Sequence, residues 1–410
     1  MRFVYRVGCA VALVACADSQ NPTVPASRHL QPTDTPLAPG STTTQFDPRS
    51  IPDRIEELVG QRLAKVSIPP DGYSLTSDAV HPDIACPPGR WSGASCWLMY
   101  TPYRNSDSGY ENPAFLSASS DTTWDTPAEI KNPIVPYPGF AKYNSDPDHA
   151  FDPITGRMVQ VYRVVADTFN KIMIMSTGDA KRWTPATIAF KERNHDAVSP
   201  SLIIQPDRQA KIWYVRTGAD GCGATTSSVQ LRTAMPDSNS SYERSEWSAS
   251  KPVNLVIPGF VIWHLDVAAL PNGTGYLAFV VAYAKGLTCG TSELWLATSS
   301  DGIVWRTFPM PVLWRTMKLA KKRGIGTWYR GTLRYDAVSD SLHLWPSALA
   351  GPTWVVYHTA VKLGASRTSP GGAANRLPKL SVLTAVIEPG DGHAVGRPRK
   401  GAGTISGPTG

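Results

Sequence analysis

Carboxylate and imidazole side chains recur at one place in a repeated strand motif of this chain, and groups of these two kinds perform most general acid–base catalysis. The candidates, in chain order, are His81, Asp83, Asp148, His149, His264 and Asp266, and the last copy of the motif carries Tyr329 and Arg330 instead. Four of the eight histidines lie at or near these motif starts, which scattered surface histidines would not do. Glycoside hydrolysis needs two carboxyl groups with separated pKa values, so it is one chemistry that this set could perform.

A loop in the first copy of the motif adds two candidates. Residues 101–115, TPYRNSDSGYENPAF, connect two predicted strands and contain Tyr110 and Glu111. A catalytic role and a structural role as a hydrogen-bond acceptor are both open for Glu111. The same choice stands for Asp146, because an Asp before a proline occupies a favourable turn position.

The elements that must position these residues are short β-strands. Only 18% of the 410 residues are charged, and the chain contains 33 Gly, 36 Pro and 13 Trp. A charge-poor chain with many aromatic residues is not globally disordered, and it lacks the composition of a helical bundle. Turn residues at this density, with Trp, Tyr, Val, Ile and Thr between them, indicate many short strands.

An internal repeat organises these strands. A pattern of apolar strand, Ser or Thr, Asp turn and Trp reads LSASSDTTW at 116–124, IMSTGDAKRW at 174–183 and LATSSDGIVW at 296–305. Successive Trp residues lie roughly 60 positions apart, counting a looser copy that ends at Trp247, and a fifth unit ends near Trp354. Five units of about four strands predict an all-β fold, a five-bladed β-propeller. A two-sheet sandwich is the alternative, but it would not explain the fixed period.

We therefore divide the chain into five parts, of which the first two are a signal at 1–15 and a tether at 16–52. The propeller is expected over residues 68–365, after a short helical lead-in at 53–67 whose apolar residues have helical spacing. Residues 366–410 form a C-terminal extension, which we expect to be partly disordered, although its strand-like run at 381–388 could complete the last blade. In a propeller the innermost strands begin around the central axis on one face. The motif starts and the loop with Glu111 are therefore expected to meet there.

The HPD start of the first unit and the strings GYENP, NPI, YNSDPDH and VSPS resemble the arabinanase- and xylosidase-type five-bladed glycosidases and their sialidase-like relatives. The Asp turn also resembles the Asp-box of those relatives, where it is a folding device opposite the active site. The resemblance implies three axial carboxylates. It places Asp83 as the base and Asp266 near the expected acid, but it finds Ser201 where an Asp should tune the acid's pKa. Asp148 or Glu111 could replace the missing carboxylate.

Three functions remain open. The leading one is a glycoside hydrolase acting on a polysaccharide or oligosaccharide. In it Asp83 is the base and Asp148, Glu111 or Asp266 the acid. The remaining residues bind substrate: His81, Tyr110, His149, Trp263, His264, Tyr329 and Arg330. The alternatives are a lyase on an acidic glycan, with Tyr329 or His149 as base and Arg330 neutralising the carboxylate, and a non-catalytic glycan-binding propeller. We assign no metal ligands. The resemblance also suggests a calcium ion at the propeller axis, although the sequence contains no Asp-rich calcium loop.

The N-terminus has the pattern of an export signal. Two arginines precede a short apolar stretch that ends in Leu13-Val14-Ala15-Cys16, which resembles a bacterial lipobox. We expect residues 1–15 to be removed, Cys16 to carry lipid and residues 16–52, rich in Ser, Thr and Pro, to be a flexible tether. An ordinary signal peptide is the alternative. The chain is thus predicted to be anchored in the bacterial cell envelope, at the outer membrane or cell surface.

The remaining cysteines fit an exported protein, since an even four of them can form two disulfides. Cys86 and Cys96 lie in one predicted hairpin, whereas Cys222 and Cys289 occupy corresponding loops of blades three and four. We predict that each pair is bonded. Removal of residues 1–15 takes away two arginines and lowers the net charge from +7 to +5, which is modest. The cationic run at 315–323 lacks the interleaved aromatic residues of a nucleic-acid groove, so no nucleic-acid partner is expected. We expect a monomer.

Overall fold

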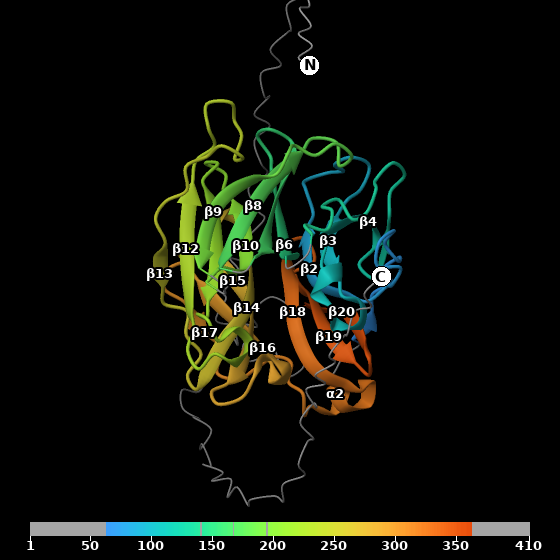
Figure 1. Ribbon diagram of the computed structural model, residues 1–410, viewed down its shortest axis with the longest axis vertical. Coiled ribbons are helices and arrows are strands. Elements are labelled where there is room, and N and C mark those ends of the chain that lie inside the picture. The colour runs from blue at the N-terminus through green and yellow to red at the C-terminus, as the bar shows by residue number, and fades with distance from the viewer. Residues whose placement is uncertain (1–62, 140–141, 167, 194–195, 363–410) are drawn as a thin grey trace, which may run out of the picture.

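The computed structural model describes residues 63–139, 142–166, 168–193 and 196–362. Within these residues twenty strands form five antiparallel sheets of four strands each (Figure 1). The first strands of the five sheets contact one another in a closed ring. This is the arrangement of a five-bladed β-propeller, so the predicted fold class is confirmed.

Four of the blades follow chain order from the inside outward. Blade 1 contains β2 (Ala79–Ala85), β3 (Trp97–Pro102), β4 (Ala114–Ser120) and β5 (Thr123–Asp125). Blade 2 contains β6 (Tyr143–Asp152), β7 (Arg157–Val165), β8 (Phe169–Thr177) and β9 (Thr187–Arg193). Blade 3 contains β10 (Val198–Ile204), β11 (Ala210–Arg216), β12 (Ser228–Ala234) and β13 (Lys251–Val253). Blade 4 contains β14 (Phe260–Ala269), β15 (Tyr276–Ala284), β16 (Glu293–Ser299) and β17 (Arg306–Thr307).

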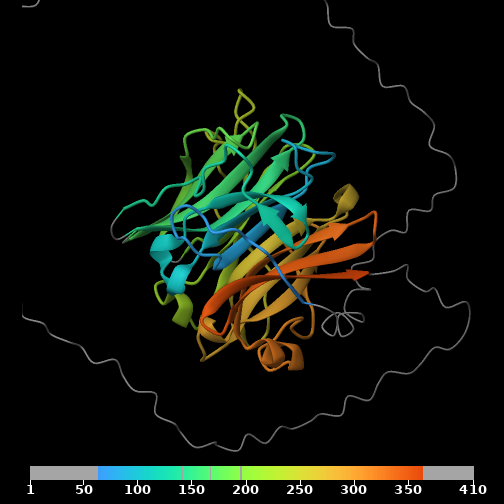
Figure 2. The ribbon, with the colours of Figure 1, turned by 90° about the vertical axis from the view of Figure 1, so that its right-hand side faces the viewer.

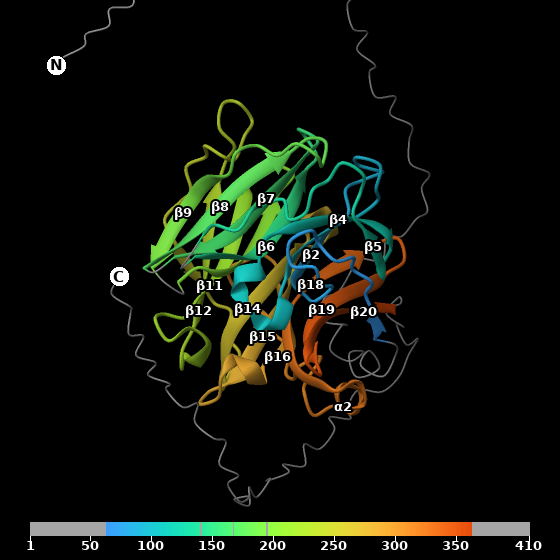
Figure 3. The ribbon, with the colours of Figure 1, turned by 45° about the vertical axis from the view of Figure 1, so that its right-hand side comes forward.

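Blade 5 closes the ring with a strand from the other end of the described chain. Its inner strands are β18 (Ile325–Asp336), β19 (Ser341–Ala350) and β20 (Thr353–Lys362), and its outer strand is β1 (Ala64–Lys65). Figures 2 and 3 show β18, β19 and β20 in orange, whereas β1 has the blue of the start of the described chain. The propeller therefore begins earlier than expected, because β1 lies within the range predicted as a helix. The rest of that helix and the strand expected at 381–388 lie outside the described residues.

Helical structure is confined to short turns between strands in the described ranges. They are α2 (Lys318–Arg323) and the 3₁₀ turns η2 (Arg104–Ser106), η3 (Ser108–Tyr110), η4 (Gly221–Gly223), η5 (Pro271–Gly273) and η6 (Cys289–Thr291). Among the described residues, no helix has the length and apolar character that crossing a bilayer requires.

The repeated Asp turn with its Trp holds neighbouring blades together. The Asp301 carboxylate accepts hydrogen bonds from the backbone amides of Ile303 and Val304, at 2.8 and 2.9 Å. This turn presents the carbonyl of Gly302, which accepts the indole N–H of Trp305 from its own blade and that of Trp213 from blade 3. Both indoles are buried in one apolar cluster. The periodic Trp therefore reports blade packing.

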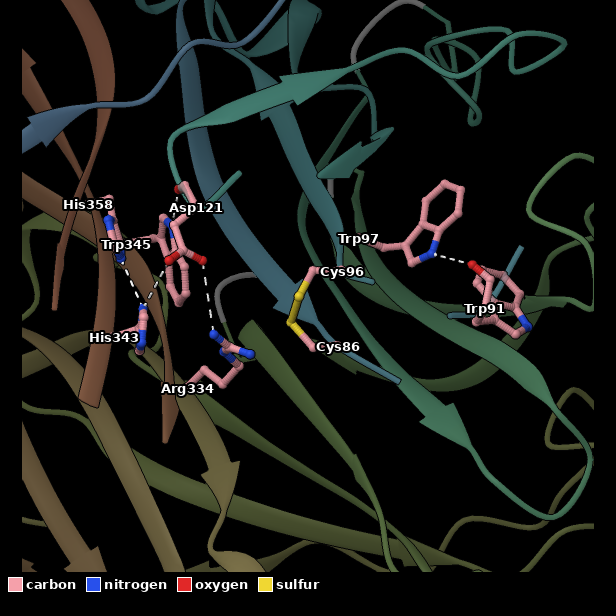
Figure 4. The surroundings of a disulfide bond; sticks show 9 residues. All are labelled: Cys86, Trp91, Cys96, Trp97, Asp121, Arg334, His343, Trp345 and His358. Atoms are coloured by element: carbon pink, nitrogen blue, oxygen red, sulfur yellow. Dashed lines mark hydrogen bonds and ion pairs between the residues drawn. A yellow bond between two sulfur atoms is a disulfide. The ribbon is translucent and has the colours of Figure 1, made fainter. Parts of the chain in front are cut away.

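Two disulfides brace the fold, and both match the predicted pairs. Cys86–Cys96 links the end of β2 to the residue before β3, beside the edge-to-face pair of Trp91 and Trp97 (Figure 4). Cys222–Cys289 joins η4 of blade 3 to η6 of blade 4 and closes a loop of 67 residues. The second bond therefore ties adjacent blades to each other.

Candidate functional site

A β-bulge interrupts every innermost strand at the same place. The register shifts fall at 80–83 in β2, 145–148 in β6, 198–201 in β10, 262–264 in β14 and 329–331 in β18. Bulges re-aim the side chains beside them. In blades 1 to 3 the bulge contains an X-Pro dipeptide whose first residue has a positive φ: 53° at His81, 49° at Asp146 and 54° at Ser199. Five aligned bulges thus direct two layers of polar side chains toward the axis.

The first layer brings His81, Asp146 and His264 together. Asp146 Oδ1 lies 3.1 Å from His81 Nε2 and 3.4 Å from His264 Nδ1. All three residues are buried, at most 2% exposed. None of these three atoms has a hydrogen-bond partner, and His264 Nε2 lacks one as well. Unpaired polar atoms are costly in a buried site, so this cluster calls for a physical explanation.

The contact of His81 Nδ1 with Thr101 indicates which ring nitrogen carries the proton. His81 Nδ1 lies 3.0 Å from Thr101 Oγ1, whose hydroxyl donates to the carbonyl of Val80 at 3.5 Å. The Thr101 oxygen therefore accepts the Nδ1 proton, and this leaves the lone pair of Nε2 directed at Asp146. Burial lowers the pKa of His81 to about 3 and that of His264 well below its usual range, so both rings are neutral. In this tautomer a nitrogen lone pair lies 3.1 Å from a carboxylate oxygen, an arrangement that a bound cation would stabilise, whereas without an ion the other tautomer would direct its Nε2–H at Asp146.

These donors fit a divalent transition metal. Zinc bonds of about 2.0–2.2 Å to nitrogen and oxygen place tetrahedral ligand atoms roughly 3.4 Å apart, which matches the two distances to Asp146 Oδ1. Two imidazoles and one carboxylate form a common catalytic zinc set that leaves a position open. Calcium prefers six to eight oxygen ligands, so the nitrogen-rich set does not favour the axial calcium that the resemblance suggested.

Three further side chains surround this cluster. Arg163 of β7 donates from Nε to Ser145 Oγ at 2.9 Å, and the same nitrogen lies 3.0 Å from Asp146 Oδ2 in an ion pair. Burial opposes ionisation of Asp146, but the nearby guanidinium of Arg163 holds its pKa well below the usual range. Glu111 Oε2 lies 3.3 Å from His81 Nδ1, and burial followed by repulsion from Asp146 raises the pKa of Glu111 well above its usual value. The ring of Tyr329 lies 4.6 Å from that of His264, and burial raises its pKa, so the phenol keeps its proton.

The second layer lies two residues further along the innermost strands and locks each blade to the next. Asp83 accepts the backbone amide of His149 at 2.6 Å, and Asp148 accepts that of Leu202 at 2.8 Å. In the same way, the backbone amide of Val267 donates to Ser201 Oγ at 2.9 Å, and that of Leu333 donates to the Asp266 carboxylate at 3.2 Å. Ser201, which stands where the resemblance expects a pKa-tuning Asp, thus takes part in this ring of interblade bonds.

Arg330 supplies countercharge to the second layer, and His149 contacts one of its carboxylates. The carboxylate oxygens of Asp83, Asp148 and Asp266 lie within 4.8 Å of one another. Arg330 is fully buried and donates to Asp148 Oδ2 at 2.8 Å, and His149 Nδ1 lies 2.5 Å from Asp83 Oδ2. Burial and the other carboxylates raise the pKa of Asp148 well above its usual value and that of Asp266 to about 6.

The two aromatic substrate-binding candidates away from the axis lie in different surroundings. Trp263 is only 6% exposed and packs in the apolar core with its edge toward His264. Tyr110 is half-buried, and its ring lies 5.6 Å from that of Tyr73, which in turn stacks on Tyr137 at 6.4 Å. Tyr73 and Tyr137 are 44% and 40% exposed, so the three rings form a tyrosine platform open to solvent.

Sequence reasoning missed Arg163 and left Asp146 undecided. Asp146 carries the same signal as His81, an X-Pro dipeptide at the start of an innermost strand, and this shared signal could have assigned it to the axis. Arg163 lies within the second strand of blade 2, where no neighbouring motif marks it.

Comparison with known proteins agrees with the fold. No family model matches the chain. A curated relative, the A type blood N-acetyl-alpha-D-galactosamine deacetylase of Flavonifractor plautii, is 24% identical over 339 residues, and the match spans 69% of this chain but only 42% of the relative. The crystal structure of an N-acetylgalactosamine deacetylase from F. plautii with blood group B trisaccharide superposes with a TM-score of 0.63 at 20% identity, over 73% of this chain and 94% of that one.

A thermostable family-43 glycoside hydrolase matches 72% of this chain and 91% of its own at 11% identity, with a TM-score of 0.48. The chain shares its fold with the F. plautii deacetylase structure, and a curated N-acetyl-alpha-D-galactosamine deacetylase is among the proteins that it is similar to.

Proposed function

We propose that this protein is a carbohydrate-active enzyme that removes the acetyl group from an acetamido sugar with the help of a divalent metal. The observation that carries the proposal is the buried cluster of His81, Asp146 and His264, whose facing atoms lack partners and have the spacing of metal ligands. The deacetylase named among the relatives supports the same reaction class. When bound, the metal would polarise the acyl oxygen and raise the acidity of water.

The surrounding residues have separate tasks in this proposal. Arg163 keeps Asp146 ionised and fixed in orientation. Thr101 holds His81 in the tautomer that presents Nε2 to the axis. Glu111, which borders the cluster at His81 Nδ1, would accept a proton from the attacking water in its ionised form and then, as the carboxylic acid, give that proton to the departing amine. Tyr329, with its phenol protonated, donates a hydrogen bond to the negative charge that develops on the acyl oxygen.

The tyrosine platform of Tyr73, Tyr110 and Tyr137 gives this site a surface for the rest of a glycan. Tyr110 directly precedes Glu111, so the platform and the axial cluster are connected through one loop. Aromatic faces bind the apolar faces of sugar rings without needing a particular charge. We therefore assign the platform to the sugar units next to the one that is deacetylated.

Glycoside hydrolysis is the second candidate, and the second axial layer favours it. Asp148 and Asp266 have raised pKa values beside Asp83, as an acid and a base of a glycosidase would. However, each of these carboxylates already accepts a backbone amide of the next blade or pairs with a buried base. We therefore rank this reaction after deacetylation.

One assay separates the reaction classes. The purified chain is supplied with zinc and incubated with oligosaccharides that contain N-acetylgalactosamine or N-acetylglucosamine. Deacetylation releases acetate and leaves a free amine, hydrolysis of the chain produces reducing ends, and elimination by a lyase gives a product that absorbs near-ultraviolet light. Acetate release that disappears in His264→Gln supports the proposal. Reducing ends or an absorbing product without acetate would refute it, and binding with no product would support the non-catalytic alternative.

We further propose that the enzyme works outside the cytoplasm, held to the bacterial envelope by lipid on Cys16. The lipobox-like end of the export signal and the two disulfides support this location. Cys16 itself lies outside the described residues. Metabolic labelling with a radioactive fatty acid should mark the full chain and fail to mark Cys16→Ser. Equal labelling of both would refute the anchor.

A further inference from the structure

A second group of possible metal ligands lies where the first and last blades meet. Asp121 belongs to the turn between β4 and β5 of blade 1, whereas His343 and His358 lie on β19 and β20 of blade 5 (Figure 4). We call these three residues the seam cluster. It is separate from the axial cluster in residues and in elements, and nothing in the proposed reaction uses it.

The distances within the seam cluster suit a metal. His343 Nδ1 lies 3.1 Å from His358 Nε2 and 3.6 Å from Asp121 Oδ2. All three ligand atoms lie within 4.8 Å of one another. A tetrahedral ion with bonds of about 2.0–2.2 Å separates its ligand atoms by roughly 3.4 Å, and the two measured distances lie on either side of this value.

The side chains are held in place before any ion binds. The indole of Trp345 stacks beside both imidazoles, with ring centroids 5.6 Å from His343 and 4.8 Å from His358, and the imidazoles stack on each other at 5.3 Å. Its N–H donates to the backbone carbonyl of Asp121 at 2.9 Å. This bond crosses from blade 5 to blade 1 and fixes the turn that carries the carboxylate. Such support of the ligands by neighbouring groups is typical of metal sites.

Asp121 has one weak ion pair and is partly open to solvent. Arg334 lies 4.0 Å from Asp121 Oδ1, a weak ion pair that leaves Oδ2 facing His343. The Asp121 side chain is 45% exposed, whereas that of His343 is only 10% exposed. A metal here would therefore have three protein ligands and a fourth position open to water, so chelators could reach it.

We propose that the seam cluster binds one divalent transition metal, zinc or an ion of similar preference, and that this ion cross-links blade 5 to blade 1. Neither disulfide crosses this seam, since Cys86–Cys96 lies within blade 1 and Cys222–Cys289 joins blades 3 and 4. The ion would join the turn of Asp121 in blade 1 to strands β19 and β20 of blade 5, the blade that β1 completes. The competing explanation is a simple hydrogen bond between the imidazoles, in which the Nδ1 proton of His343 is donated to His358 Nε2.

The test measures zinc binding to the full chain after removal of metal with a chelator. To silence the axial cluster, all variants carry His264→Gln. The seam variant adds Asp121→Asn, which retains the turn and its backbone carbonyl. The matched control adds Asp125→Asn, an exposed carboxylate on the neighbouring strand β5. Calorimetry and metal analysis should find one zinc per chain in the His264→Gln parent and the control, and at least a tenfold weaker affinity in the seam variant.

Zinc should also raise the melting temperature of the parent and the control but not that of the seam variant. Equal zinc affinity in all three proteins, or no zinc bound by the parent, would overturn the proposal in favour of the hydrogen-bonded pair. Crystals of the unaltered chain soaked in zinc give an independent readout if the substituted proteins fold poorly. An anomalous peak among Asp121, His343 and His358 is expected, and density there without a peak would also overturn it.

Discussion

The loss of Arg330 should destabilise the propeller strongly at neutral pH. This guanidinium is fully buried and donates to Asp148 at 2.8 Å and to the carbonyls of Pro147 and Pro200 at 3.0 and 3.2 Å. It is the group that compensates three buried carboxylates whose oxygens lie within 4.8 Å. In Arg330→Met a side chain of similar length fills part of the space but carries no charge and no donor.

The expected loss follows from the buried pair. Removal of one partner from a buried ion pair costs about 3–5 kcal/mol, because the other charge stays buried without compensation. Asp148→Asn should relieve part of this cost, since its amide oxygen can still accept the Leu202 amide and its side chain is neutral. The double variant should therefore be more stable than the sum of the single effects predicts, by at least about 2 kcal/mol.

Unfolding in guanidinium chloride, followed by tryptophan fluorescence at pH 7 with disulfides intact, measures these values. The parent, both single variants and the double variant complete a double-mutant cycle. A loss of less than about 1 kcal/mol in Arg330→Met, or additive effects of the two substitutions, would mean that Arg330 does not compensate Asp148.

Three other changes test the framework of the fold. Replacing Cys222 and Cys289 with serine should lower the free energy of unfolding by about 4 kcal/mol, from the entropy of a 67-residue loop; a loss below about 1 kcal/mol in chemical denaturation would contradict this. Gly331→Ala places a Cβ 2.7 Å from backbone atoms of Pro346 and Trp345. Because such overpacking costs about 1–3 kcal/mol, the melting temperature should fall, and an unchanged melting temperature would contradict this. Burial opposes ionisation of Glu192, but hydrogen bonds from Arg232 and Tyr214 lower its pKa below 4.5. Its ionised form therefore stabilises the fold above pH 4.5, and this contribution is lost as the pH falls through the lowered pKa. Glu192→Gln should show a shallower loss of stability over that acid range, and an identical slope would count against the contact.

The fold could be predicted because its sequence signals are local and repeated. Each Asp turn and its Trp form within one blade, so the count of five emerges from the sequence. The closing strand Ala64–Lys65 could not be found, because two residues carry no periodicity and their partner β20 lies almost 300 positions away.

The location of the site could be predicted from the sequence, but not which residues belong to its first layer and which to its second. His81 and Asp83 are two positions apart on one strand, so alternation alone places both on the same side. The bulge between Val80 and Asp83 decides that the imidazole joins the open cluster while the carboxylate bonds to blade 2. Arg163 reaches the axis from a second strand, and only the packing of β7 against its neighbours shows that contact.

If the axial cluster of His81, Asp146 and His264 holds a metal that deacetylation requires, bound zinc and activity must rise together. The most direct test adds zinc in steps to metal-free protein and measures bound zinc and acetate release together, using Asp121→Asn so that only the axial cluster binds. Acetate release should rise in proportion to the first equivalent of zinc and then stay constant, and His264→Gln in the same background should remain inactive. Full acetate release by the metal-free protein would contradict the claim.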